Sequence, residues 1–128
     1  MYPENDMLIF LKIIKETRVD KIVFVSLLGV ENPIVAHLQI ENMIKELEIP
    51  YVFSRPSFFM QNLITNHKEE IKEKDELYIS AGRSKISFVN TRNITKVSTI
   101  ILKEDKYKNI AITLIGNDSI DYDELFKI

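Results

Sequence analysis

Residues 54–62 have the sequence Ser-Arg-Pro-Ser-Phe-Phe-Met-Gln-Asn, and the rest of the chain is organised around them. They follow the apolar run 51–53 and lead into a long segment with helical character. A residue before proline is pushed towards extended backbone, so we expect Arg55 to lie at the end of a strand. Pro56 is then expected to open a helix. Such a strand end is typical of the ligand-facing edge of an open α/β sheet, and the alternative is that Phe58, Phe59 and Met60 are core residues.

The composition is that of one globular domain. The chain has 128 residues, of which 45% are hydrophobic and 28% are charged. A formal net charge of −2 argues against nucleic acid as a partner, because nucleic-acid binding requires a basic face. The chain has no cysteine, which excludes a disulfide framework and a thiol nucleophile and fits a cytoplasmic protein. No apolar run is long enough to span a membrane, so no membrane partner is expected.

The sequence contains only three glycines, and their positions indicate turns. Gly29, Gly82 and Gly116 each stand alone near the end of an apolar run. The sequence contains neither Gly-x-Gly-x-x-Gly nor Gly-x-x-x-x-Gly-Lys. The 128 residues therefore include no recognisable loop for cradling a phosphate.

Apolar periodicity and turn residues predict an alternation of helices and strands. The expected elements are a helix over 7–14, a strand over 22–28, a helix over 33–48, a strand over 50–54, a charged helix after residue 62, short strands over 77–80 and 86–89, a helix over 91–102, a strand over 110–116 and a short helix after residue 121. We expect Asn5 or Asp6 to cap the first helix and Asn32 the second, and Asp121 and Glu124 have the spacing of a capping box. This order predicts the α/β class: a partial Rossmann-like, mainly parallel sheet flanked by helices.

The two helices on either side of strand 22–28 present a packing problem. If both crossovers are right-handed, these helices lie on the same face of the sheet. The opposite face must then be covered by later segments, by a second copy of the chain, or by something outside this sequence.

Several segments together resemble one known family. They are residues 21–31, His37-x-x-x-Glu41, residues 50–62, residues 87–94 and residues 114–116. These segments resemble the NmrA-like atypical short-chain dehydrogenase/reductases. The resemblance implies a Rossmann domain that binds NAD or NADP, in a lineage of quinone and azo reductases and redox sensors. It also implies that residues 1–128 form a truncated, carboxy-side portion of that fold. The family carries its glycine-rich loop on an earlier βαβ unit, so we expect weak or no cofactor binding by this chain alone.

The resemblance also suggests catalytic positions. Ser26 stands where the family places the serine that binds the substrate carbonyl, and His37 stands where many relatives have the proton-donating tyrosine. Glu41 replaces the lysine of the Tyr-x-x-x-Lys pair, where it could accept a hydrogen bond from the cofactor ribose but would raise a neighbour's pKa. The alternative is that His37 and Glu41, four residues apart, form only a surface pair. His-x-x-x-Glu by itself is weak evidence for a metal site, and none is assigned.

The remaining expected contacts follow residue 54. The resemblance places Arg55, Pro56 and Ser57 along the nicotinamide end of the cofactor. It places Phe58, Phe59 and Asn62 on the substrate side, where they permit a planar aromatic substrate. Asn90 and Asn93 stand where the family often has aspartate, and an asparagine there can still cap the next helix.

A different function class is also open. A partial Rossmann sheet exposes a strand edge beside residues 22–27 and an apolar face, and both favour association. The chain would then be a non-catalytic module that forms a homodimer or pairs with a separately encoded first half. A third interpretation is a remnant of a disrupted reading frame without a selected function.

Overall fold

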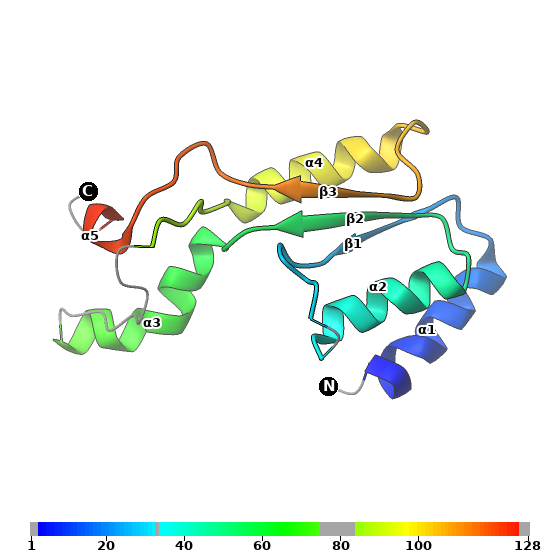
Figure 1. Cartoon of the computed structure of the whole chain (residues 1–128), viewed down its shortest axis with the longest axis horizontal. Coiled ribbons are helices and arrows are strands. Elements are labelled where there is room, and N and C mark those ends of the chain that lie inside the picture. The colour runs from blue at the N-terminus through cyan, green and yellow to red at the C-terminus, as the bar shows by residue number, and fades with distance from the viewer. Residues whose placement is uncertain (1–2, 33, 75–83, 126–128) are drawn as a thin grey trace.

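The computed structural model describes residues 3–32, 34–74 and 84–125. In chain order the elements are α1 (Pro3–Thr17), β1 (Ile22–Val25), α2 (Ala36–Glu46), β2 (Tyr51–Pro56), α3 (Met60–Lys74), α4 (Thr91–Lys103), β3 (Ile110–Leu114) and α5 (Tyr122–Leu125) (Figure 1). The α/β class predicted from the sequence is confirmed. Within the described residues, no helix is both long enough and apolar enough to cross a membrane.

The three strands form one parallel sheet in the order β1-β2-β3. Phe53 in the central strand is level with Phe24 on one side and Ala111 on the other. Parallel strands need crossover connections, and α2 supplies the one between β1 and β2. β1 and β3 are the two edges of this sheet.

Helices cover both faces of the sheet (Figure 1). On one face α1 packs against α2, and a buried cluster joins both helices to the sheet: Leu11, Ile40, Ile44, Ile49 and Phe53. On the other face α4 contacts β1 and β2. A later segment therefore covers the second face, which was one of the three alternatives left open by the sequence.

Two predicted helix starts are wrong. α1 begins at Pro3, so Asn5 and Asp6 lie within the helix instead of capping it. Proline is tolerated in a first helical turn, because its missing N–H would have no partner there. α2 begins at Ala36, and the Asn32 side chain instead accepts a hydrogen bond from the Ile34 backbone N–H at 3.0 Å. Asn32 thus stabilises the turn before the helix, where short polar side chains compete with helical bonding.

The path of the chain after residue 54 also differs from the prediction. Arg55 is extended as expected, but Pro56 is the last residue of β2 and α3 begins only at Met60. Pro56 stays in the strand because β3 continues beside it as far as Leu114. Residues 86–89 form single bridges, Ile86 with Ile120 and Val89 with Phe59, and are not a strand. The predicted strand 77–80 and the turn at Gly82 lie outside the described residues.

The two later caps are confirmed. The Asn90 side chain accepts a hydrogen bond from the Arg92 backbone N–H at 2.9 Å, at the start of α4. Asp121 and Glu124 form the reciprocal capping box, with side chain-to-backbone distances of 3.1 and 2.8 Å. Each bond satisfies an N–H group that has no partner within its helix.

Candidate active site at the ends of β1 and β2

The carboxyl ends of β1 and β2 lie side by side. Beyond the last ladder pair, the Ser26 N–H donates to the Ser54 carbonyl at 2.8 Å, and the Leu28 N–H donates to the Pro56 carbonyl at 3.0 Å. Residues 26–28 are therefore held directly beside residues 54–57. This is the edge of a parallel sheet at which open α/β folds bind their ligands.

An apolar pocket of about 350 Å³ opens at this edge. Its lining residues come from the two strand ends and the start of α3: Leu27, Leu28, Pro56, Ser57, Phe58, Phe59 and Asn62. The structure thus brings together the predicted substrate-side residues with Pro56 and Ser57. Phe58 is 60% exposed, so the alternative that it is a core residue is wrong.

Leu27 and Leu28 are lining residues that the sequence-based prediction missed. They appeared to be the continuation of a buried strand. In the structure β1 ends at Val25, and both leucines are exposed after it. The available signal was their position just before Gly29, whose φ of +71° turns the chain away from the sheet.

The wall formed by residues 57–60 is anchored from behind. The Ser57 N–H donates to the Leu114 carbonyl at 2.9 Å, and its hydroxyl donates to the Ser87 carbonyl. The Val89 N–H donates to the Phe58 carbonyl at 2.8 Å, and the Met60 N–H donates to the Val89 carbonyl at 3.0 Å. The segment around Val89 therefore fixes the backbone that carries Phe58 and Phe59.

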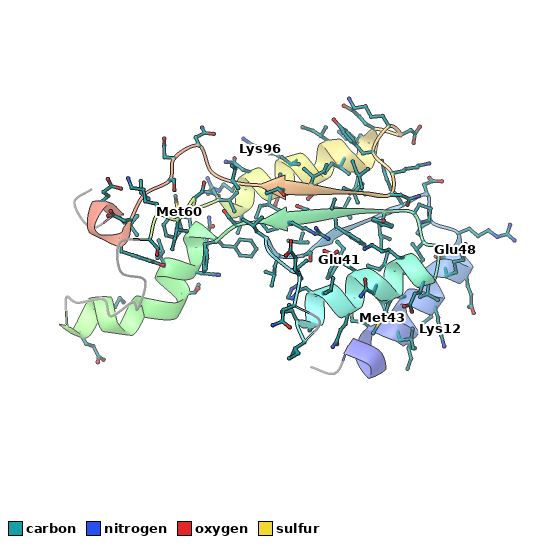
Figure 2. The ribbon with its side chains drawn as sticks, in the orientation of Figure 1. Lys12, Glu41, Met43, Glu48, Met60 and Lys96 are labelled. Carbon is teal, nitrogen blue, oxygen red and sulfur yellow. The ribbon has the colours of Figure 1, made fainter. Side chains whose placement is uncertain are left out.

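Directly before the pocket-lining residue Pro56, Arg55 forms a two-point ion pair with Glu41. Arg55 Nε lies 3.0 Å from Glu41 Oε1, and Arg55 Nη2 lies 2.5 Å from Glu41 Oε2. The Glu41 side chain is fully buried, on the side of α2 that faces the sheet (Figure 2), whereas 29% of the Arg55 side chain is exposed. Paired geometry of this kind is the strong form of a charge-assisted hydrogen bond.

The pair shifts the pKa of both groups. Burial alone would raise the pKa of Glu41, but the hydrogen bonds from Arg55, the nearby Ser26 hydroxyl and the positive charges of Arg55 and Lys45 together outweigh it. The net pKa of Glu41 therefore lies below its ordinary value. The hydrogen bond to Glu41 raises the pKa of Arg55 further. Both groups are thus charged at neutral pH.

A second cavity, of about 460 Å³, lies between the start of α4 and the segment after β3. Asn90 and Asn93 line it. The backbone N–H groups at this helix start already have partners: Thr91 donates to Gln61 Oε1 and Arg92 donates to Asn90 Oδ1. The helix start is therefore capped by the protein's own side chains.

No family model matches the chain. Among curated proteins, prestalk A differentiation protein A of Dictyostelium discoideum is 25% identical over 126 residues, covering 98% of this chain and 41% of that protein. The NAD(P)H azoreductase of Xenophilus azovorans is 30% identical over 80 residues, covering 62% of this chain and 28% of that protein.

Two solved structures share the fold. Triphenylmethane reductase of Citrobacter sp., complexed with NADP(H), superposes with a TM-score of 0.80 at 20% identity, covering 99% of this chain and 47% of its own. The NADPH-dependent quinone oxidoreductase of Escherichia coli, complexed with NADPH, superposes with a TM-score of 0.78 at 18% identity, covering 90% of this chain and 42% of its own.

The azoreductase and the two solved structures are reductases of one type. The chain is related to the NmrA-like, atypical short-chain dehydrogenase/reductases. Its sheet and helices correspond to part of their Rossmann-like fold. The chain spans less than half the length of each of these four proteins.

The three positions predicted to be catalytic or cofactor-binding near β1 and α2 have different surroundings. Ser26 is buried, and its hydroxyl faces Glu41 but has no partner at full hydrogen-bond geometry. His37 is half-buried with its ring 6.0 Å from that of Phe24, and it does not line the pocket. The surface-pair alternative for His37 and Glu41 is wrong, because Glu41 is buried and pairs with Arg55.

Proposed function

We propose that this chain is the carboxy-side portion of an NAD(P)(H)-binding, reductase-like domain, and that the 350 Å³ pocket is the wall against which nicotinamide and substrate meet. The observation that carries this proposal is the position of the pocket, at the carboxyl ends of two adjacent parallel strands. Two proteins with the same fold were solved with NADP(H) or NADPH. We further propose a cytoplasmic location, which fits a chain without cysteine.

In this proposal, we assign each predicted residue a role according to whether its side chain is exposed or buried. Arg55, Pro56 and Ser57 form the cofactor edge, with the exposed part of Arg55 available to a ligand. Ser26 is buried at the end of its strand, and we assign its hydroxyl the role of hydrogen-bond donor to a substrate carbonyl. Glu41 is fully buried and acts on the cofactor edge through Arg55. His37 is the weakest assignment, since it neither lines the pocket nor adjoins a lining residue in sequence, whereas Ser26 directly precedes Leu27 and Arg55 directly precedes Pro56.

The residues present fit the nicotinamide end of a cofactor better than its pyrophosphate end. An apolar wall with a nearby serine and arginine suits a flat, partly polar ring, whose chemistry when bound is the donation of a hydride. The sequence contains no glycine-rich loop of the kind that binds pyrophosphate at a helix start. The 128-residue chain is therefore proposed to hold NAD(P)(H) weakly.

The substrate class that fits is a planar aromatic acceptor such as a quinone or an azo compound. Phe58, Phe59 and the two leucines offer apolar surface for ring contacts, and Asn62 adds one polar group that can orient a ligand. The names of three related proteins, an azoreductase, a triphenylmethane reductase and a quinone oxidoreductase, support an aromatic substrate.

Titration calorimetry with NADPH tests the cofactor part of the proposal. We expect a dissociation constant of about 1 mM or weaker, which corresponds to a binding free energy of only about −4 kcal/mol. The physical reason is that pyrophosphate contacts normally supply much of the affinity. Binding in the micromolar range would contradict the proposal that this chain holds only the nicotinamide wall.

A specific surface favours the second candidate function, a non-catalytic association module. Among the described residues, β1 pairs only with β2 and is an edge strand. An apolar groove of about 330 Å³ runs beside it, lined from α1 by Phe10 and from β1 by Val23, among others. On α1 the side chains of Ile9, Phe10 and Ile13 are more than half exposed. We propose that a second copy or an amino-side half covers this region. Size-exclusion chromatography with light scattering tests it, and a clean monomer at high concentration, with no separate partner bound, would contradict it.

A further inference from the structure

The two sides of the apolar pocket are continuous in sequence with the two groups that surround Glu41. Ser26 precedes Leu27 and Leu28, which line one side of the pocket. Arg55 precedes Pro56 and Ser57, which line the other. Arg55 forms two hydrogen bonds to the Glu41 carboxylate, and the Ser26 hydroxyl lies near it without forming a full hydrogen bond.

We propose that Glu41 is a positioning residue for this pocket: from α2 it fixes Arg55, and through Arg55 it fixes residues 56–57 and residues 27–28, which the backbone hydrogen bonds hold beside them. This inference rests on the proposed ligand-binding function of the pocket. Glu41 itself is fully buried and is not one of the lining residues.

The geometry of the ion pair explains why Glu41 can act in this way. A planar guanidinium held at two nitrogen atoms has its orientation fixed, unlike an ammonium held at one point. The Arg55 side chain is therefore held in one orientation on β2, one residue before the pocket wall begins at Pro56. The backbone hydrogen bonds between β1 and β2 fix the spacing of the two strand ends. The Glu41 carboxylate in addition fixes how the side chains at those ends are oriented.

The residue sits on an element that is itself rigidly held. Ile40 and Ile44, on either side of Glu41 along α2, are buried in the cluster shared with α1 and Phe53. Movement of Glu41 would require repacking of that cluster. The pocket is therefore connected, through one carboxylate, to the buried cluster between α1, α2 and the sheet.

The test replaces the ion pair by apolar side chains, because this can preserve folding while removing the positioning contact. The full chain and a Glu41→Leu/Arg55→Met double variant are compared by backbone amide NMR and by titration with 1,4-naphthoquinone. We expect the double variant to remain folded, to show altered amide shifts at Leu27, Leu28, Ser57 and Phe58, and to bind naphthoquinone about tenfold more weakly. Unchanged shifts and unchanged affinity in this variant would overturn the proposal.

Two further variants separate positioning from general stability. Glu41→Gln keeps the side-chain shape and one hydrogen-bond acceptor, so we expect smaller shifts in the same four amides. This variant replaces the double variant in the test if the double variant does not fold. Lys106→Gln removes the exposed ion pair with Glu104 and should leave these amides unchanged. If the unmodified chain fails to bind naphthoquinone, the proposed ligand class fails, while the amide shifts still decide whether Glu41 positions the pocket.

Discussion

Glu41 and Arg55 are joined across the sheet–helix interface by two hydrogen bonds, of 3.0 and 2.5 Å, between a fully buried carboxylate and a guanidinium that is 29% exposed. The two residues belong to different elements, the crossover helix α2 and the end of the central strand β2. The resemblance predicts that Glu41 stands where the reductases have a lysine. If that prediction holds, this chain has an acidic, already paired group where a cationic one would assist proton transfer.

Removing the carboxylate should destabilise the protein. Glu41→Ala leaves Arg55 without its partner in a partly buried site, so we expect a loss of about 3 kcal/mol in the free energy of unfolding, the lower end for a broken buried pair. Urea denaturation followed by circular dichroism measures it. Lys106→Ala breaks an exposed pair with Glu104 and is the matched control, with no measurable change expected. Equal midpoints for Glu41→Ala and the unmodified chain would contradict the burial of this pair.

The same pair predicts how stability depends on pH. The pKa of Glu41 is lower in the folded state than its ordinary value of 4.5, so the unfolded state takes up a proton first as the pH falls. The stabilisation from Glu41 is therefore present above pH 4.5 and is lost as the pH falls through the folded-state pKa. The difference in urea midpoint between the unmodified chain and Glu41→Gln should shrink from about pH 7 to about pH 3. A difference that grows on acidification would have the wrong sign.

Gly116 should be intolerant of any side chain. A Cβ at this position would lie 2.0 Å from the carbonyl oxygen and 3.1 Å from the carbonyl carbon of Phe88, both backbone atoms. Because these atoms cannot rotate away, we expect Gly116→Ala to cost about 1–3 kcal/mol through forced backbone shifts. Gly29→Ala is the comparison: it meets no atom within 4 Å, and only its φ of +71° opposes it, at about 1 kcal/mol. A thermal melt in which Gly29→Ala is the more damaging change would contradict this account.

Lys21 should stabilise the end of α4 from a distant part of the chain. It is only 9% exposed, and its ammonium group donates to the Glu104 carbonyl at 2.5 Å and to the Tyr107 carbonyl at 3.4 Å. Lys21→Met keeps the apolar stem but removes the donor, so we expect a loss of about 1–3 kcal/mol from unsatisfied carbonyl groups. Lys103→Met, at an exposed position in the last turn of α4, is the control. Differential scanning calorimetry would show equal melting temperatures for both variants if the Lys21 contacts were unimportant.

Much of the fold could be predicted because it is encoded locally. The long periodic runs gave α1, α4 and the three strands, and the capping box at Asp121 and Glu124 was visible from spacing alone. The errors arose where a distant partner decides the structure. Pro56 stays extended because β3 pairs beside it, and β3 lies more than fifty residues further along the chain.

In the candidate site, too, the features that depend on a distant partner could not be predicted from the sequence. The family resemblance predicted that residues 56–59 lie along one ligand cleft, and the structure brings them together in one pocket. The partner of Glu41 could not be predicted from the sequence. Sequence spacing pointed to His37, four residues away, whereas the structure pairs Glu41 with Arg55, 14 residues away on the next strand. The usable signal was a pair of opposite charges, one on a crossover helix and one at the end of the following buried strand.

The central claim, that the ends of β1 and β2 form a nicotinamide and substrate wall, is tested most directly by NMR titration with NADPH. Weak binding still shifts the amides that it touches, even when the dissociation constant is about 1 mM or more. The account predicts progressive shifts confined to residues 26–28 and 55–59, without saturation at micromolar concentrations. Shifts that are absent from these residues, or that cluster instead around α1 or the second cavity, would contradict it.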